Sequence, residues 1–553
     1  MSVFAASMSA QRGNNIDARK LQLALYAISN LYVDSTSETK LVEDAIVGML
    51  EKLDPHSTYT DPEETKEMTE PLQGNFDGIG IQFNMLTDTL YVIQVIPGGP
   101  SEKVGLMAGD RIIMVDDTLI AGVKMKNTDV MKRLRGPKNT EVRVKVLRGG
   151  VPDLIEFKIT RGKIPVYSLD AAYMADKTTG YIKLNRFAAS SADEFREALE
   201  KLKKQGMKNL ILDLQGNGGG YLNIAIDLAD EFLGKDKLIV YTEGNKQPRE
   251  EAKSSARGGF EEGRLVVLVD ETSASASEIL SGAVQDWDRG VVVGRRTFGK
   301  GLVQKPIPMP DGSMIRLTVA RYYTPTGRSI QKPYVNGNQE QYNHDLIDRY
   351  NRGELMSADS IHFPDSMKYN TLETKRIVYG GGGIMPDIFI PRDTSGVTSY
   401  FSNVVNSGML NLYALEYSDR NYDKLASFKT YQDLHKYLQQ QPLLSDFTNY
   451  AAAKGIKKRP HLINISGKLI EKQIQAYIVR NFFDEAGFYP IFQNDDITLK
   501  RAVKVLNEGK SFPVLENKNN TPNGIAQSQT NASRGYGFLK EIIYEDYIAG
   551  SLC

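Results

Sequence analysis

The chain has 553 residues with 68 Lys and Arg against 68 Asp and Glu, so its formal net charge is zero. That length predicts roughly three to five domains, and 41% hydrophobic and 25% charged residues are typical of globular proteins. The balanced charge gives no global attraction to nucleic acid, and we expect no nucleic-acid partner. A single cysteine, Cys553, and five histidines without HExxH spacing exclude a disulfide framework, an internal cysteine nucleophile and a zincin-type metal site.

Residues 1–16 are predicted to be the remnant of a signal peptide or a tag. In MSVFAASMSAQRG a short apolar piece precedes small residues that end at Ala10, which resembles the end of a signal peptide. A signal peptide implies an exported protein of the cell envelope or periplasm, and a cysteine-poor chain fits an oxidising compartment. No apolar run of the sequence reaches the roughly 18 residues that a membrane helix needs.

Residues 17–72 are predicted to be helical. In SETKLVEDAIVGMLEKL, apolar residues recur at helical spacing and form one face. The following LDPHSTYTDPEE contains two prolines, which end helices. His56 lies in this segment, and we assign it no chemistry.

Residues 73–162 predict a small β-rich domain, because alternating or β-branched runs such as LYVIQVI and EVRVKVL are separated by glycine-rich turns. Gly78, Ile79, Gly80 and Ile81 form the sequence GIGI at the start of a predicted strand. Such glycines let successive N–H groups point into one concavity that can bind a terminal carboxylate, beside a strand edge that takes an extended peptide. The stretch from here through GLMAGDRII resembles a PDZ domain of the bacterial protease type.

Residues 163–395 alternate strand-like runs such as NLILDLQ and RLVVLVD with helix-like runs, which predicts an α/β domain with a partly parallel sheet. Helices dominate in residues 396–515. The helix in GKLIEKQIQAYIVRNFFDEAG is expected to end at its last glycine. Residues 516–553 are predicted to be a flexible linker and tail, because they begin polar and rich in Gly, Asn and Ser.

Three motifs in the α/β region could carry chemistry. Three consecutive glycines end at Gly220, and their amides could donate to an anion, although a tight strand-to-helix turn also explains them. Ser275 precedes Glu278 in S-x-x-E spacing, so it is either a helix cap or a nucleophile at the positive end of a helix. Lys300 lies between two glycines and is either solvated or a base whose pKa its surroundings lower. Gln304, four residues later, could orient its amine.

The motifs together resemble the C-terminal processing peptidases, also called tail-specific proteases, which are serine peptidases with a Ser–Lys dyad. The resemblance covers about residues 20–395 and follows the family's order: LDPHSTY, the PDZ-like stretch, DLQGNGGGYL, SASASEI, TFGKGLVQ, YYTPTGRSIQ and GIMPD. It implies a multidomain α/β protein. The expected parts are the helical N-terminal region, a PDZ domain at 73–162, a crotonase/ClpP-like protease core at 163–395 and a helical C-terminal extension.

The resemblance also implies roles for particular residues. Ser275 matches the nucleophile, Lys300 the general base and Gln304 the residue that orients the lysine. The amides of Ala276 and Gly219 match the oxyanion hole, and Gly78, Ile79, Gly80 and Ile81 match the peptide-carboxylate loop of the PDZ domain.

The expected function is that of a serine endopeptidase that binds the flexible C-terminal tail of a protein or peptide through its PDZ domain and cleaves it through an acyl-enzyme. No metal or cofactor is expected, and the helical regions could form a homo-oligomer. One alternative is a non-catalytic PDZ scaffold or pseudoprotease, which would lack the serine or the lysine. Another is an acyl-transfer or ligand-binding protein of the crotonase type, against which the PDZ domain and TFGKGLVQ argue.

Overall fold

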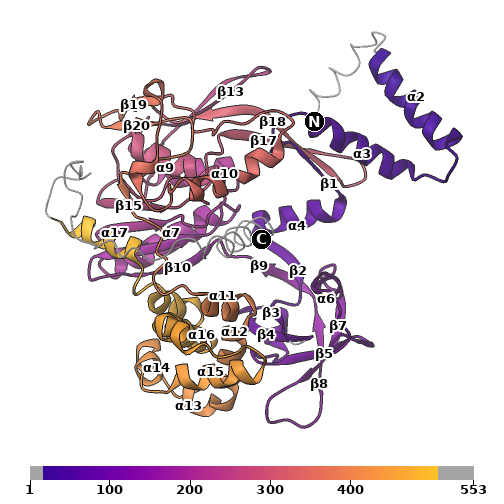
Figure 1. Ribbon diagram of the computed structural model, residues 1–553, viewed down its shortest axis with the longest axis vertical. Helices are drawn as coiled ribbons and strands as arrows, with labels where there is room; N and C mark the ends of the chain where they lie inside the picture. Colours follow the sequence, from indigo (N-terminus) through magenta and orange to yellow (C-terminus); the bar gives the residue numbers. More distant parts are fainter. Residues whose placement is uncertain (1–15, 87, 509–553) are drawn as a thin grey trace.

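The computed structural model describes residues 16–86 and 88–508 (Figure 1). The predicted signal remnant, apart from its last residue Ile16, and the predicted tail at 516–553 lie outside these residues. The described chain forms an N-terminal helical arm, a β-rich domain, an α/β core and a C-terminal helical domain, as predicted. Among the helices of residues 16–86 and 88–508, none is long and apolar enough to cross a membrane.

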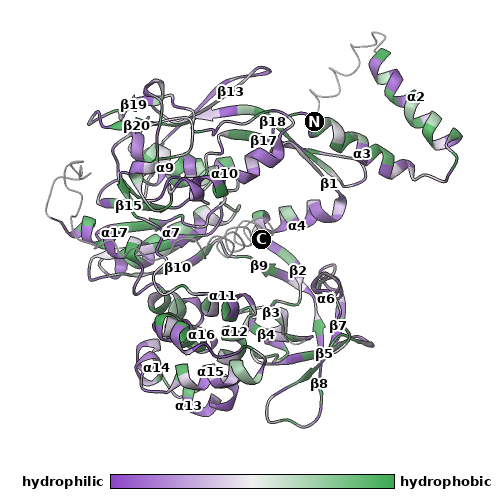
Figure 2. Ribbon diagram, viewed as in Figure 1, coloured by the Kyte–Doolittle hydropathy of each residue, from purple (hydrophilic) through white to green (hydrophobic). Residues whose placement is uncertain are grey.

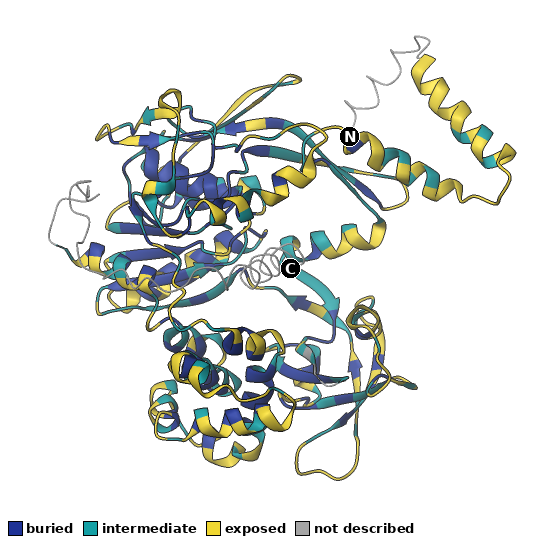
Figure 3. Ribbon diagram, in the orientation of Figure 1, coloured by how far each residue is buried: buried dark blue, intermediate teal, exposed yellow. Residues whose placement is uncertain are grey.

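The N-terminal arm contains the helices α2 (Ile16–Leu31), α3 (Glu38–Leu50) and α4 (Pro62–Gln73). α2 buries none of its residues and projects away from the rest of the molecule (Figures 1 and 3). α4 begins at a capping box formed by Asp61 and Glu64. Between α3 and α4, in the proline-containing segment where helices were expected to end, the chain forms a short strand, β1 (Thr58–Thr60), that was not predicted. Its pairing with a strand far along the chain stabilises it, and local periodicity cannot show such a pairing.

The β-rich domain is an antiparallel sheet with two short helices. In spatial order its strands are β3 (Ile81–Leu86), β4 (Thr89–Val95), β5 (Arg111–Val115), β7 (Glu141–Leu147) and β8 (Ile155–Thr160), with β6 (Thr118–Leu119) beside β5. Its helices are α5 (Pro100–Lys103) and α6 (Asn127–Leu134). The pair β2 (Asn75–Gly78) and β9 (Gly162–Pro165) joins its entry to its exit, so the domain is inserted as a unit. Among the described strands β3 pairs only with β4, and it therefore forms a sheet edge.

The α/β core is built on a six-stranded sheet. Its strands, in spatial order, are β10 (Leu169–Met174), β11 (Thr179–Leu184), β12 (Asn209–Asp213), β15 (Arg264–Val269), β16 (Val291–Gly294) and β21 (Ile388–Phe389). All neighbouring pairs are parallel except β10 with β11. The central strands are continuous apolar runs, because parallel strands are buried on both faces (Figure 2). One face packs against α7 (Ser191–Lys204), α8 (Leu222–Asp230) and α9 (Ala276–Asp286). The other face packs against α17 (Ile497–Asn507).

A second sheet covers the helices of the core. It contains β1, β18 (Met314–Tyr323), β13 (Leu238–Gly244) and β14 (Gln247–Lys253) in that order, and β17 (Leu302–Pro308) also pairs with β18. The chain then continues through α10 (Gln339–Asn351) and the hairpin of β19 (Lys368–Asn370) and β20 (Ile377–Tyr379). The N-terminal arm is thereby attached to the core through β1 and β18.

The C-terminal helical domain comprises α11 (Ser399–Asn406), α12 (Met409–Arg420), α13 (Tyr422–Ala426), α14 (Tyr431–Leu438), α15 (Leu443–Ala453) and α16 (Pro460–Phe492). The prediction that the long helix ends at Gly487 is wrong, because α16 continues to Phe492. A Cβ at Gly487 would lie 2.7 Å from Phe483 Cβ, so glycine serves close packing there instead of a cap. The helical φ/ψ are interrupted earlier, at Asp484 with φ 51°.

Candidate active site

Ser275 lies where the chain passes from β15 into α9, one residue before the helix begins. Its backbone has φ 55° and ψ −111°, a conformation that residues with a Cβ rarely adopt. Ser273 fixes the preceding loop, since its hydroxyl donates to Leu214 O at 2.8 Å and accepts from Asp270 N at 2.9 Å. This strained strand-to-helix turn places the serine at the positive end of α9.

Glu278 joins the turn of Ser275 to the loop of Lys300. Its side chain is fully buried. Oε2 accepts from Ser275 N at 2.8 Å and from Lys300 N at 2.9 Å. Oε1 accepts from Gly299 N at 2.8 Å and from Thr297 Oγ1 at 2.5 Å. Burial raises the pKa of this carboxyl to about 7, while the four donors favour its charged form.

The sequence singled out Glu278 only as the partner of Ser275 in a helix cap, and its role in holding Lys300 was missed. Local spacing could not show that role, because the lysine loop follows the next strand of the sheet. One signal was available in the sequence. Small and apolar neighbours at the helix start predict that Glu278 is buried, and a buried carboxylate needs several hydrogen-bond donors.

Lys300 lies in the loop between β16 and β17 and lines the same cavity as Ser275. Burial, helped by the nearby Arg316 charge and opposed by Glu278, lowers the pKa of Lys300 from 10.5 to about 7. The Tyr322 hydroxyl holds the two loops together, because it lies 2.5 Å from Lys300 O and 3.1 Å from Ser275 O. Because the pKa of Lys300 is about 7, a substantial fraction of its amine is uncharged at neutral pH.

Gln304 lies on β17 and also lines this cavity. Its Nε2 donates to Leu302 O and to Thr318 Oγ1, each at 3.3 Å. These bonds leave the oxygen of the Gln304 amide as the atom that could accept from the Lys300 amine.

The glycine-rich turn between β12 and α8 approaches the start of α9. Gly219 has φ 106°, and a Cβ there would lie 2.9 Å from Ser275 Cβ and 3.1 Å from Ala276 N, so the approach requires glycine. Asn217 O accepts from Ala274 N at 3.0 Å, which fixes the turn against the serine loop. The Gly219 N–H donates to Asn217 Oδ1 at 2.9 Å. This amide is engaged in the structure, and it would have to exchange that partner to serve an oxyanion.

One cavity of about 540 Å³ unites these elements. Its lining includes every residue predicted for the reaction centre, namely Ser275, Ala276, Lys300, Gln304 and Gly219. No group of three or more His, Cys, Asp or Glu side chains that could hold a metal ion occurs within residues 16–86 and 88–508.

The LDPHSTY turn reaches this site from the N-terminal arm, a contribution that the sequence did not reveal. Asp54 Oδ1 accepts from Thr318 Oγ1 at 2.8 Å, and Oδ2 accepts from Ser57 Oγ at 2.6 Å. Because Thr318 also accepts from Gln304, a hydrogen-bond chain runs from Asp54 to the cavity wall. The negative charge of Asp54 raises the pKa of Lys300, against the effect of burial.

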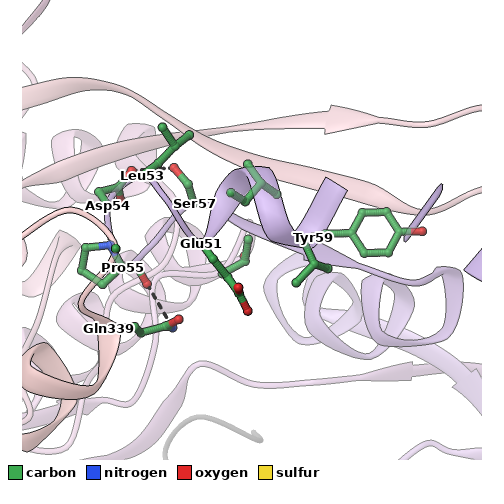
Figure 4. A pocket seen from close by; sticks show the side chains of 11 residues that line it. Glu51, Leu53, Asp54, Pro55, Ser57, Tyr59 and Gln339 are labelled. Carbon is green, nitrogen blue, oxygen red and sulfur yellow. Dashed lines mark hydrogen bonds between the residues drawn. The ribbon is translucent and has the colours of Figure 1, made fainter. Parts of the chain in front are cut away.

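The same turn also lines a second, smaller pocket of about 130 Å³, whose walls include Asp54, Pro55 and Gln339 (Figure 4). Gln339 Nε2 donates to Pro55 O at 3.5 Å across it. His56 points elsewhere, with Nε2 2.9 Å from Tyr342 OH. Burial, helped by nearby cations, lowers the pKa of His56 to about 2, so the ring is neutral.

The four residues predicted to bind a peptide carboxylate span the junction of β2 and β3. Gly78 ends β2, and Ile81 begins the edge strand β3. Ile79 is 3% exposed and belongs to the core of the β-rich domain, where its carbonyl accepts from Ser101 N at 3.0 Å. Gly80 has φ 79°, the left-handed conformation that turns the chain into β3.

A serine on a strained turn that shares a cavity with a buried amine whose pKa is lowered to about 7 has the chemistry of a serine hydrolase with a lysine base. Family comparisons define the class further. Peptidase family S41 matches residues 178–340, and a PDZ domain matches residues 78–159. The activating protease CtpB N-terminal domain matches residues 3–65, and a family of unknown function matches residues 400–484.

Individual relatives agree with these families. The carboxy-terminal-processing protease of Bartonella bacilliformis is 38% identical over 306 residues, which are 54% of this chain and 69% of the relative. The carboxy-terminal processing protease CtpB of Bacillus subtilis is 35% identical over 336 residues, 59% of this chain and 68% of the relative. Among solved structures, the photosystem II D1 C-terminal processing protease has 30% identity and a TM-score of 0.32, covering 56% of this chain and 89% of that chain.

The chain therefore belongs to the carboxy-terminal processing proteases of peptidase family S41. It is a serine peptidase with a PDZ domain, as its motifs predicted.

Proposed function

We propose that this protease is an endopeptidase that uses Ser275 as nucleophile and Lys300 as general base on proteins with flexible C-terminal tails. The observation that supports this most strongly is the burial of Lys300 in the cavity of Ser275, which lowers its pKa to about 7. A neutral amine at physiological pH can accept the proton of a serine hydroxyl, which an ordinary lysine cannot do efficiently.

In the proposed mechanism, Lys300 accepts the proton of Ser275 Oγ as this oxygen attacks the scissile carbonyl. The Ala276 N–H donates to the developing oxyanion. The Gly219 N–H becomes the second donor when it exchanges Asn217 Oδ1 for the oxyanion, and such a donor is worth about 2.7–4 kcal/mol in a comparable protease. The lysine returns the proton to the leaving amine, and a water activated by the same amine releases the acyl group.

Two further side chains position the base in this proposal. Gln304 accepts from the Lys300 amine through its free amide oxygen and thereby orients the amine toward Ser275. Glu278 fixes the distance between the two loops, because it binds the backbone amides of Ser275 and Lys300.

We assign tail recognition to Gly78, Ile79, Gly80 and Ile81. The tail carboxylate binds the amides of this turn, and the chain before it adds to the free edge of β3 as a further strand. A peptide whose terminal carboxylate is amidated should therefore bind more weakly to the PDZ domain.

The deciding experiment compares the parent with Ser275→Ala and Lys300→Ala on β-casein with a free or a blocked C-terminus. Exposed residues of the same types provide matched controls, Ser395→Ala and Lys235→Ala. We expect both site variants to be inactive, both controls to be active, and the blocked substrate to be cut more slowly. Equal cleavage by all five proteins would exclude the proposal.

Self-association through the helical regions is also proposed. α2 exposes Leu21, Leu23, Tyr26 and Leu31, each more than half accessible, on a helix without buried residues. Such a surface favours burial against a second copy. Sedimentation of the parent and of Leu23→Glu tests this, because the charge should shift the protein toward monomer.

Location in the cell envelope is a separate proposal. Cell fractionation, with N-terminal sequencing of the cellular protein, tests it.

A further inference from the structure

Arg316 lies on β18 and lines the cavity that contains Ser275 and Lys300. Its Nη1 donates to Met68 Sδ at 3.0 Å, and a thioether is a weak acceptor. Among the residues that the structure describes, no carboxylate forms an ion pair with it. Burial lowers the pKa of this guanidinium, with no opposing carboxylate.

Other arginines buried in the core have strong acceptors: Arg295 and Arg328 are paired with acids, and Arg289 donates to three backbone carbonyls. Arg295 Nε lies 2.5 Å from Glu271 Oε2, and Arg328 Nη2 lies 2.7 Å from Asp286 Oδ1. A charge removed from water needs such a partner, because its lost hydration is otherwise uncompensated. Arg316 departs from this pattern at the wall of the reaction cavity, where an incoming ligand can supply the missing acceptor.

The charges around the cavity have one sign. Apart from Lys300, whose lowered pKa leaves it partly neutral, its charged lining residues are Arg186 and Arg316, and the described lining contains no Asp or Glu. Arg186 Nε donates to the neutral amide oxygen of Asn185 at 2.8 Å. A concave site lined by one sign of charge concentrates ligands of the opposite charge.

We propose that Arg316 binds a carboxylate of the peptide substrate, so that the protease prefers an acidic group close to the scissile bond. This inference rests on the proposed function of the Ser275 cavity. The planar guanidinium presents two N–H groups that match the two oxygens of a carboxylate, a geometry that a lysine ammonium does not offer. The carboxylate is either an Asp or Glu side chain or the terminal carboxylate of a short tail.

A set of fluorogenic peptides separates these sources. In a neutral background, one Glu is moved through the positions on both sides of the cleaved bond, with Gln at the same position as reference. Each peptide is made with a free and with an amidated C-terminus. In the parent we expect Glu to raise kcat/KM about tenfold over Gln at one position, as for a charge-assisted hydrogen bond. An advantage that follows the free C-terminus instead identifies the terminal carboxylate as the group bound.

The variants are Arg316→Gln, Arg316→Lys and, as a matched control, Arg321→Gln on the exposed part of the same strand. Arg316→Gln should abolish the advantage of the carboxylate, Arg316→Lys should keep part of it, and Arg321→Gln should keep all of it. Each Glu-to-Gln ratio is taken within one enzyme at one pH, so any change in Lys300 protonation cancels.

Binding to Ser275→Ala, measured by fluorescence anisotropy, gives a second readout that needs no turnover. We expect the same preference for the carboxylate peptide, lost when Arg316→Gln is added. A parent that cleaves all peptides equally, or a preference that survives in Arg316→Gln, would overturn the inference and leave the proposed function intact. If Ser275→Ala cleaved the peptides at the parent rate, the proposed function itself would fail.

Discussion

Protonation of Lys300 should stop the reaction, and its surroundings set the pH at which this happens. With a pKa of about 7, roughly half of the enzyme carries the neutral amine at pH 7 and about one tenth at pH 6. At the ordinary lysine pKa of 10.5, only about one molecule in 3,000 would be neutral at pH 7. If Lys300 is the base, as proposed, the lowering of its pKa supplies a factor of roughly 10³ in the concentration of neutral amine at neutral pH.

Glu278 titrates in the same pH range as Lys300 and makes the dependence of activity on pH steeper. Its pKa is also raised to about 7, and its charged form accepts from all four donors that connect the two loops. As the pH falls, Lys300 gains a charge and Glu278 loses one, and both changes remove activity. A plot of log kcat/KM against pH should then have a slope between one and two on its acid side. The apparent pKa of this acid limb is a property of the pair of groups and not of either residue alone.

The assay is kcat/KM from pH 5 to pH 10 with a fluorogenic peptide that has no group titrating in this range. We expect an acid limb centred between about pH 6 and 8 and a level region above it. Thermal unfolding at each pH shows whether the protein stays folded along the limb. A level profile down to pH 5, or an acid limb centred near pH 10, would refute the argument that burial lowers the pKa of the catalytic lysine into the neutral range.

Three substitutions test the same electrostatics. Lys300→Met should be inactive yet more stable, because the lowered pKa costs up to about 5 kcal/mol as the pH falls from 10.5 to 7 and this cost disappears with the amine. Urea unfolding should show a much larger gain at pH 6 than at pH 10, where most of the cost is already absent, and equal midpoints of the two proteins at pH 6 would contradict the reasoning. Glu278→Gln should lower kcat on the order of 10²-fold, because an amide cannot accept from four donors, and unchanged kinetics would show that the link between the loops is dispensable. Asp54→Asn should move the acid limb to lower pH, since the carboxylate it removes raises the pKa of Lys300, and a shift to higher pH would reverse the assigned sign.

Much of the site could be predicted because each of its motifs is local. The strand, glycine turn and helix around Gly219, and the small residues around Ser275, have the composition that a close approach of backbone to ligand requires. The order of the motifs then indicated the family. Spatial proximity of the glycine turn and the serine turn also follows from the fold, because β12 and β15 are adjacent parallel strands whose carboxyl ends meet at one edge.

The parts that escaped prediction depend on contacts between distant segments. Asp54 is connected to the cavity wall because β1 pairs with β18, which brings the carboxylate to Thr318. Glu278 looked like a helix cap until the lysine loop was placed against it. Gly487 looked like a helix end, although its lack of a side chain is used for packing against Phe483. In each case a short motif had two physical explanations, and tertiary structure selected between them.

The C-terminal helical domain carries no recognisable chemical motif, yet it contacts both the PDZ domain and the protease core. Tyr91 and Ile93 of β4 in the PDZ domain pack into its apolar core, and Asp484 accepts from Gln94 at 2.8 Å. On its other side, Tyr489 donates to Asp170 of the core sheet at 2.9 Å. The segment α16, with its interruption at Asp484, therefore contacts both the PDZ domain and the core sheet. Asp484, the residue with the non-helical backbone in α16, is thus also the residue that accepts from the PDZ domain.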